Sequence, residues 1–191
     1  MTIRRLVVAS KNSDKVKEVE EILEALGVVE EVVQGLDWPD IEETGQSLEE
    51  NALLKARAVA AATRLPALAD DTGLEVEALD GRPGVMTARL AGPKASYAEN
   101  VTALLAELGS RTDRAAVFRT VVALVDPGGE ATVAEGSLRG WIANEPRGDN
   151  GFGYDPVFVV EGRRLAEMSS EEKHALSHRA RALRALAAKL S

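Results

Sequence analysis

Two pairs of adjacent carboxylates are the residues of this chain best suited to chemistry. Glu42 and Glu43 lie in a turn-rich loop, and Asp70 and Asp71 come at the end of a short apolar run that predicts a strand. Mg²⁺ prefers carboxylate oxygens and completes its coordination shell with waters and substrate phosphates. The two pairs could therefore converge on one Mg²⁺, although Glu42 and Glu43 taken alone could be solvated loop residues.

A second polar segment, SKNSDK, follows an apolar run and precedes a helical pattern; it comprises Ser10, Lys11, Asn12, Ser13, Asp14 and Lys15. Unpaired N–H groups at a helix N-terminus attract anions, so Ser10, Asn12 and Lys15 would suit a phosphate group. In the simpler interpretation, Ser13 or Asp14 caps the helix and Lys15 is a solvated surface residue.

Lys55 is another candidate for phosphate binding. It lies on a helix that begins with the capping-box pair Ser47 and Glu50, and it follows Asn51 by four residues, so both side chains project from one helix face. That face begins near the acidic loop. A lone helix lysine is, however, more often simply exposed.

The glycine-rich segment GDNGFGYDP suits a base-binding loop. Gly148, Gly151 and Gly153 permit backbone conformations that are closed to other residues, which would let the loop present Phe152 and Asp155 to a ligand. The alternative is a plain tight turn with Phe152 buried in the core.

Cationic and polar residues gather around the start of the last predicted helix: Lys173, Ser177, His178 and Arg179. Capping by Ser177 and an amphipathic pattern explain the helix itself. They do not explain cations in its first turn, where the helix dipole disfavours positive charge unless a ligand offsets it. Purine carbonyl oxygens or phosphates would do so.

The helices and strands that the sequence predicts around these residues indicate an α/β fold with a mixed central sheet flanked by helices. Periodicity predicts strands at residues 6–9 and 28–33, before Asp70 and in LEVEAL, and helices at 16–26, 47–64, 96–108 and after Ser169 and Ser177. FRTVVALVDPGGEATVAEGSLRGWI predicts two long hairpin strands, and VFVV predicts another strand.

Bulk properties narrow the possible functions. The 191 residues predict a single domain, 1–191, and the net charge of −8 argues against broad binding to nucleic-acid backbone. The chain has no cysteine, which excludes disulfides and thiolate metal sites. It also has no apolar run long enough for a bilayer, and its N-terminal run is too brief for a signal peptide, so a cytoplasmic location is expected.

Seven motifs in register resemble the inosine/xanthosine triphosphate pyrophosphatase family; they are SKNSDK, EETG, LEENALLKA, ADDTGLEVEAL, GSLRGWI, GFGYDPVF and EEKHALSHR. The resemblance runs from the first predicted strand to the last helix. It implies two lobes with a central nucleotide-binding cleft, a homodimer, and release of pyrophosphate from ITP, dITP or XTP with Mg²⁺.

The resemblance also assigns roles residue by residue. It implies that the SKNSDK loop and Lys55 bind the triphosphate, that Glu42 or Glu43 with Asp71 binds the metal, and that Asp71 is the general base. It implies that Thr72 contacts the substrate, and that the base is recognised by Phe152, Gly153, Tyr154, Asp155, Lys173, His178 and Arg179. A catalytically silent nucleotide-binding module and a pyrophosphatase for pyrimidine triphosphates remain the alternatives.

Overall fold

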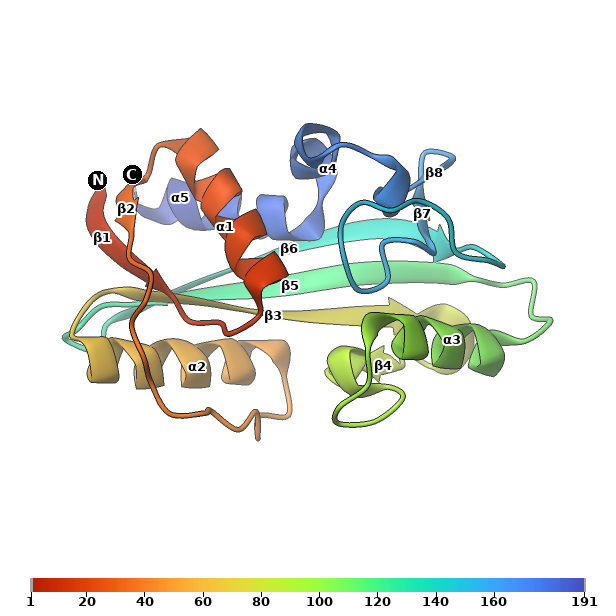
Figure 1. Cartoon of the computed structure of the whole chain (residues 1–191), viewed down its shortest axis with the longest axis horizontal. Helices are drawn as coiled ribbons and strands as arrows, with labels where there is room; N and C mark the ends of the chain where they lie inside the picture. The colour runs from red at the N-terminus through yellow and green to blue at the C-terminus, as the bar shows by residue number, and fades with distance from the viewer. Residues whose placement is uncertain (1, 191) are drawn as a thin grey trace. The chain divides into compact units, whose positions relative to one another are not determined.

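The structure is a computed structural model that describes residues 2–190. Over this range the strands form an eight-stranded sheet in the order β2-β1-β3-β5-β6-β7-β8, with β4 beside β3 (Figure 1). β1 runs parallel to β2 and β3, whereas β3–β4, β6–β7 and β7–β8 are antiparallel. The predicted α/β fold with a mixed sheet is confirmed.

The chain divides into two compact units. The first unit contains the residues up to Asp71, Thr120–Gly136 and the residues from His178 onward; the second contains Thr72–Arg119 and Ser137–Ser177. Each unit has its own hydrophobic core. The prediction of a single domain and that of a central cleft stay predictions.

The first unit is built from β1 (Ile3–Val8), α1 (Ser13–Leu26), β2 (Val29–Val32), α2 (Leu48–Thr63), the start of β3 (Ala67–Val76), the end of β5 (Ala115–Val125), the start of β6 (Ala131–Ile142) and α5 (His178–Leu190). In this unit α1 and α5 cover one face of the strands and α2 covers the other (Figure 1). Its core joins Leu6 of β1, Ile22 of α1, Leu68 of β3 and Leu183 of α5.

Local signals set the ends of the helices in this unit. Gly27 caps the end of α1 in the left-handed conformation, which glycine adopts without steric cost. Ser47 accepts a hydrogen bond from the backbone N–H of Glu50, as a capping residue should. The other half of the predicted capping box differs, because the Glu50 carboxylate accepts from the N–H of Gln46. Glu50 therefore fastens the preceding loop to α2.

The strand β3 corrects one expectation. Asp70 and Asp71 were expected to end a short strand, and LEVEAL to form another, but the structure has one ten-residue strand from Ala67 to Val76. The two aspartates lie in its middle, both buried. Burial of adjacent charges inside a strand is tolerated because each aspartate has cationic partners, which the sequence pattern does not display.

The second unit contains the rest of β3, β5 and β6 together with β4 (Pro83–Gly84), α3 (Tyr97–Leu108), β7 (Phe158–Val160), β8 (Arg163–Arg164), α4 (Ser170–Leu176) and short 3₁₀ turns at Glu77–Leu79, Thr87–Arg89 and Leu165–Glu167. Both α3 and α4 begin with complete capping boxes, Ser96 with Glu99 and Ser169 with Glu172. Its core includes Leu104, Phe118 and Phe158.

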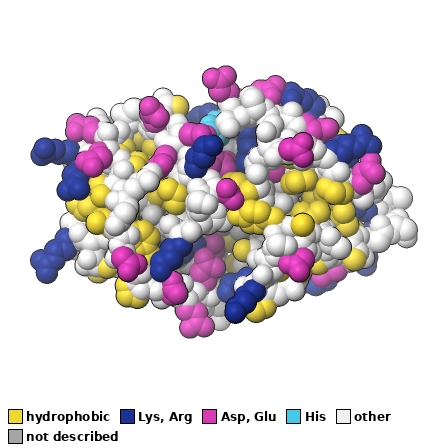
Figure 2. Space-filling model, in the orientation of Figure 1, with side chains coloured by type: hydrophobic (Ala, Val, Ile, Leu, Met, Phe, Trp, Pro, Cys, Tyr) yellow, Lys and Arg dark blue, Asp and Glu magenta, His cyan; other side chains and the backbone are white. Residues whose placement is uncertain are grey.

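Among residues 2–190, no helix is long and apolar enough to span a bilayer. On the face shown in Figure 2, Lys and Arg side chains are scattered among Asp and Glu side chains.

Gly136 on β6 allows α5 to approach the sheet closely. A Cβ at this position would collide with the backbone N of Ala182 and the carbonyl oxygen of His178, and backbone atoms of a packed helix cannot move aside cheaply. We expect Gly136→Ala to lower the free energy of unfolding by roughly 1–3 kcal/mol, as overpacking does. Urea unfolding followed by circular dichroism measures this change.

Gly128→Ala is the matched control. Gly128 is exposed, and the nearest atom to an added Cβ is the flexible end of Asp126, 3.3 Å away. Its effect should stay within about 0.5 kcal/mol. Equal stability of the two variants would show that α5 does not constrain β6 at Gly136.

Candidate active site

The pleat of β3 sends its two buried aspartates to opposite faces of the sheet. Successive side chains of a strand point in opposite directions. Asp70 accordingly contacts α1 and α5 through Lys15 and Arg179, whereas Asp71 contacts α2 through Lys55 and Asn51. The predicted convergence of four carboxylates is therefore not what the structure shows: Asp70 lies in one cluster, Asp71 and Glu43 lie in another, and Glu42 is exposed.

The Asp70 cluster is a buried chain of ion pairs. Arg179 donates from Nε and Nη2 to Asp70 Oδ2, both at 3.1 Å, and from Nη1 to Glu18 Oε2 at 3.0 Å. Lys15 Nζ lies 3.3 Å from Asp70 Oδ1. Two acids and two bases thus neutralise one another where each carboxylate alone would be costly to bury.

The cations keep Asp70 ionised. Burial by itself would raise the pKa of Asp70, but the charges of Lys15, Arg179 and Lys55 outweigh it and hold that pKa well below its ordinary value. Asp70 is thus a carboxylate with both oxygens engaged by protein cations. Those contacts favour a role in holding Lys15 and Arg179 in place.

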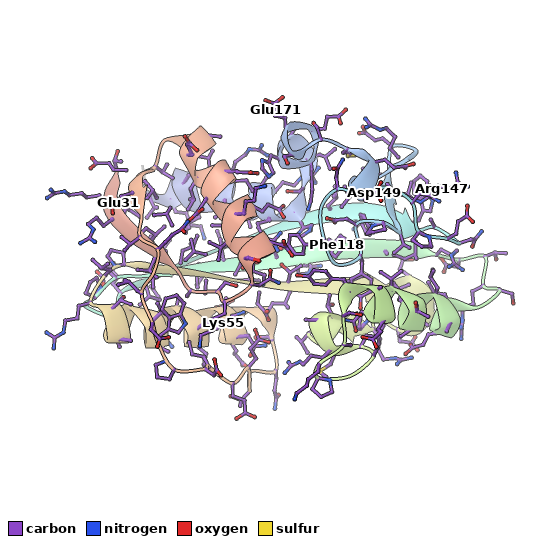
Figure 3. All side chains as sticks on the ribbon, viewed as in Figure 1. Glu31, Lys55, Phe118, Arg147, Asp149 and Glu171 are labelled. Carbon is purple, nitrogen blue, oxygen red and sulfur yellow. The ribbon has the colours of Figure 1, made fainter. Side chains whose placement is uncertain are left out.

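The Asp71 cluster brings together two of the predicted metal ligands. Lys55 Nζ donates to Glu43 Oε1 at 2.8 Å, to the Asp70 backbone oxygen at 2.8 Å and to Asp71 Oδ1 at 3.2 Å. Figure 3 shows the Lys55 side chain on α2 directed toward the strands. Glu43, not the exposed Glu42, is therefore the acidic-loop residue that lies near Asp71.

Burial and charge shift the pKa values of this cluster. Burial raises the pKa of the Asp71 carboxyl and outweighs the attraction of Lys55, and Glu43 adds to the rise. Burial alone would lower the pKa of Lys55, but Asp71, Asp70 and Glu43 outweigh it and raise it. In the absence of a bound cation, this raised pKa makes the Asp71 carboxylate a better proton acceptor than an ordinary aspartate.

Glu43 and Asp71 suit a divalent cation whose remaining ligands come from waters and phosphate oxygens. In the part of the chain that the structure describes, no three His, Asp or Glu side chains gather into a metal-binding group. Mg²⁺ needs only one or two protein carboxylates when substrate phosphates and waters supply its other ligands. Glu43 and Asp71, which share one ammonium group within 3.2 Å, meet that requirement.

The SKNSDK loop forms the N-terminus of α1. The structure gives the capping role to Asn12 rather than to Ser13 or Asp14, since Asn12 Oδ1 accepts from the N–H groups of Asp14 and Lys15. Asn12 has the extended backbone that an N-cap requires. Exposed Lys11 pairs with Asp40, so within this loop Lys15 alone joins the buried cluster.

The glycine-rich loop of the second unit is held together from inside. Gly148, Gly151 and Gly153 all have positive φ, as the sequence indicates. Asp155 is buried, and its Oδ2 accepts from the N–H of Phe152 at 2.9 Å. The space that this carboxylate fills is available only because Gly151 has no Cβ.

Lys173 links α4 to this loop. Its ammonium lies 2.7 Å from Asp155 Oδ2 and 4.9 Å from the centre of the Phe152 ring, a cation–π contact. The Phe152 ring is half-buried and also contacts Tyr97, whereas Tyr154 is buried and donates its hydroxyl to the Thr87 carbonyl. Phe152 is thus the aromatic ring of this loop that a ligand could stack on.

His178 and Arg179 open α5 and are buried in the first unit. His178 Nδ1 lies 2.6 Å from the hydroxyl of Thr120, a fully buried residue of β5. A partner at Nδ1 restrains the orientation of the ring, and because the Thr120 hydroxyl can donate or accept, the contact is satisfied by either tautomer. Thr72 follows Asp71 on β3 and is half-buried.

A family model matches residues 6–189 of this chain, and the family is described as the Ham1 family. The chain belongs to the Ham1 family. The predicted family membership is thereby confirmed, over nearly the whole length of the protein.

Relatives of this Ham1-family chain share about half of its residues. A protein of Geobacter sulfurreducens named dITP/XTP pyrophosphatase is 48% identical over 184 residues, covering 94% of this chain and 92% of the relative. One of Deinococcus deserti with the same name is 50% identical over 97% of this chain and 88% of its own. The solved HAM1 protein of Coxiella burnetii has a TM-score of 0.86 and 43% identity, covering 98% of both chains.

Sequence reasoning missed some partners in the Ham1-family site. It assigned nothing to Glu18 or Thr120 and gave Asn51 no role beyond sharing a helix face with Lys55. The sequence spacing could have predicted the position of Glu18, because Glu18 lies one turn after Lys15 on α1 and so shares a helix face with it. Thr120 had none, since only the folded chain brings β5 to the start of α5.

Asp70→Asn should destabilise the Ham1-family chain strongly, because it leaves Arg179 buried with one partner fewer. We expect a loss of roughly 3–5 kcal/mol at pH 7, measured by urea unfolding. The pKa of Asp70 is lower in the folded state than its ordinary value of about 4. The ionised Asp70 therefore makes its full contribution to the free energy of unfolding above about pH 4, and this contribution is lost as the pH falls below that value. The difference between variant and wild type should therefore shrink in acid.

Asp40→Asn supplies the control, since Asp40 is an exposed partner of Lys11. Surface pairs contribute about 0–1 kcal/mol. A loss from Asp70→Asn no larger than that from Asp40→Asn would contradict the assignment of Asp70 to a buried ion-pair chain.

Proposed function

We propose that this chain is a nucleoside triphosphate pyrophosphohydrolase that converts non-standard purine nucleotides, ITP, dITP and XTP, to the monophosphate and pyrophosphate. The observation that carries the proposal is the Asp71 cluster, in which the ammonium group of Lys55 bridges Glu43 and the buried carboxylate of Asp71. That arrangement offers a general base, a metal-binding pair and a cation for phosphate in one place. The names of the relatives support the substrate class.

Asp71 is the proposed general base. It would orient a water molecule and accept its proton as the oxygen attacks the α-phosphorus in line, so that the α–β bridging oxygen leaves with pyrophosphate. Glu43 and Asp71 would hold Mg²⁺, which when bound neutralises charge on the phosphate oxygens. Of the other predicted ligands, Glu42 is exposed and Asp70 is engaged by Arg179 and Lys15.

Lys15 and Lys55 are the proposed cations for the triphosphate, together with the SKNSDK loop. Both ammonium groups are already placed beside carboxylates, and fixed charges cost little reorganisation when negative charge builds up on the leaving group. Asp70 then acts as the counter-ion that holds Lys15 in position. Local cations of this kind let an acidic protein bind a polyanion.

Recognition of the base is proposed for Phe152 by stacking and for His178, Arg179 and the glycine-rich loop by hydrogen bonding. A 6-oxo purine presents an acceptor where adenine presents an amino donor. Placing that amino group against protein donors leaves them unpaired, at about 1–3 kcal/mol per lost bond. The Thr120 contact supports this role for His178, because it orients the imidazole.

The homodimer implied by the resemblance and the cytoplasmic location expected from the sequence are part of the same proposal. Nucleotide pools are cytoplasmic, so an enzyme that removes deaminated purine triphosphates before polymerases use them would act there.

Pyrophosphate release from ITP, XTP, dITP and ATP, with Mg²⁺ or with EDTA, tests the reaction. We expect turnover of the first three substrates, its loss in EDTA, and kcat/KM for ATP at least about tenfold lower. Asp71→Asn should reduce kcat by roughly 10²–10⁴-fold, since it removes the proton acceptor. Tight ITP binding without turnover by the wild type would instead indicate a silent nucleotide-binding module.

Phe152→Leu tests the stacking role separately. Base–aromatic stacking contributes about 1–3 kcal/mol, so we expect KM for dITP to rise roughly 5- to 100-fold with kcat little changed. Tyr97→Leu alters the ring beside Phe152 and should change KM less. A fall in kcat at unchanged KM would refute base stacking on Phe152.

A further inference from the structure

Asn51 is a buried amide next to the Asp71 cluster, 1% exposed, and the mechanism above does not use it. We propose that Asn51 is a positioning residue: its carboxamide joins the backbone of Gly45 to the carboxylate of Asp71, and so holds the Glu43 loop and Asp71 in register. The catalytic consequence rests on the proposed pyrophosphohydrolase function. The structural link can be measured without it.

The two ends of the amide have different partners, which fixes its orientation. The N–H of Gly45 donates to Asn51 Oδ1 at 2.8 Å, and Asn51 Nδ2 donates to Asp71 Oδ2 at 3.2 Å. A reversed amide would set a donor against the Gly45 N–H and an acceptor against a carboxylate. The Asn51 side chain is therefore hydrogen-bonded to one backbone group and to one carboxylate of the candidate site at the same time.

Asn51 and Lys55 together restrain both oxygens of Asp71. Lys55 contacts Oδ1, and Asn51, one helical turn earlier on α2, contacts Oδ2. A carboxylate held at both oxygens cannot rotate freely about its terminal bond. Because Asn51 is neutral, it restrains Asp71 without adding a charge to the cluster.

The acidic loop is fitted tightly to Asn51. A Cβ on Gly45 would lie 2.6 Å from Asn51 Oδ1 and 2.8 Å from Glu50 Cβ, although the backbone of Gly45 does not have positive φ. Gly45 is thus required by close approach alone. Two residues before it, Glu43 reaches Lys55, so displacing Gly45 would also displace a proposed metal ligand.

Asn100 provides a matched control on α3. Ser47 precedes Asn51 by four residues as its helix cap, and Ser96 precedes Asn100 in the same way. Asn100 is 3% exposed, accepts from the Ala91 N–H at 2.9 Å and donates to the Ala88 oxygen at 3.1 Å. It ties a loop to a helix as Asn51 does, but the partners of its amide, the Ala91 N–H and the Ala88 oxygen, are both backbone groups.

The experiment compares Asn51→Ala with Asn100→Ala in the full chain. We expect both to lower stability in urea by similar amounts. Asn51→Ala should reduce kcat for dITP by roughly 10- to 100-fold with KM changed less than about threefold, because the reacting groups are misplaced rather than lost. Asn100→Ala should keep kcat within about twofold of the wild type.

A second readout does not depend on activity. Hydrogen exchange of the Gly45 amide, measured without metal or nucleotide, should become roughly tenfold faster in Asn51→Ala. Asn51→Asp retains an acceptor for Gly45 but replaces the donor facing Asp71, so it should keep the protection of Gly45 while still losing kcat. These outcomes separate the two halves of the link.

Gly45→Ala disturbs the same contact from the loop side, because the added Cβ would collide with Asn51 Oδ1. This variant replaces Asn51→Ala in the experiment if Asn51→Ala fails to fold, and it too should lower kcat. Unchanged kcat in the folded Asn51 variants, or equal losses in Asn100→Ala, would overturn the positioning role. If the wild type releases no pyrophosphate from any substrate, the proposed function fails, and Gly45 exchange in Asn51→Ala still decides whether the link exists.

Discussion

Adjacent buried carboxylates on one strand require separate cations on each face of the sheet. Asp70 and Asp71 lie side by side in β3, and the pleat turns one toward α1 and α5 and the other toward α2. Each face must then supply positive charge at the right depth, because an unpaired buried carboxylate is several kcal/mol too costly. The arrangement of three helices around β3 in the first unit meets this requirement.

Asp70 and Asp71 have different partners on the two faces of the sheet, and this difference suits them to different roles. On one face, Arg179 and Lys15 occupy both oxygens of Asp70 and keep it ionised. On the other face, burial raises the pKa of Asp71, whose partners are an ammonium group and a neutral amide. The first carboxylate is suited to holding its neighbours still, and the second to exchanging a proton.

The glycine-rich loop of the second unit follows the same principle on a smaller scale. Asp155 is directed into its own loop, where it accepts from the Phe152 N–H and pairs with Lys173. The buried ion pair ties the loop to α4 and leaves the half-buried ring of Phe152 held at its accessible face. A pre-formed stacking surface loses less entropy on binding than a mobile one.

The sequence by itself determined the order of the helices, the mixed α/β class, the positive φ of the three glycines in the glycine-rich loop and the motifs of the Ham1 family, because these depend on local periodicity, turn chemistry and residue order. It also placed Asn51 and Lys55 on one helix face. Only the tertiary structure decided that β3 runs through Asp70 and Asp71, that Glu43 rather than Glu42 lies near Asp71, and that Asn12 caps α1. Those outcomes depend on which cations and N–H groups the folded chain brings within hydrogen-bonding distance of these side chains, about 3 Å. Most of these partners are far apart in the sequence, so no periodic pattern of residues reveals them.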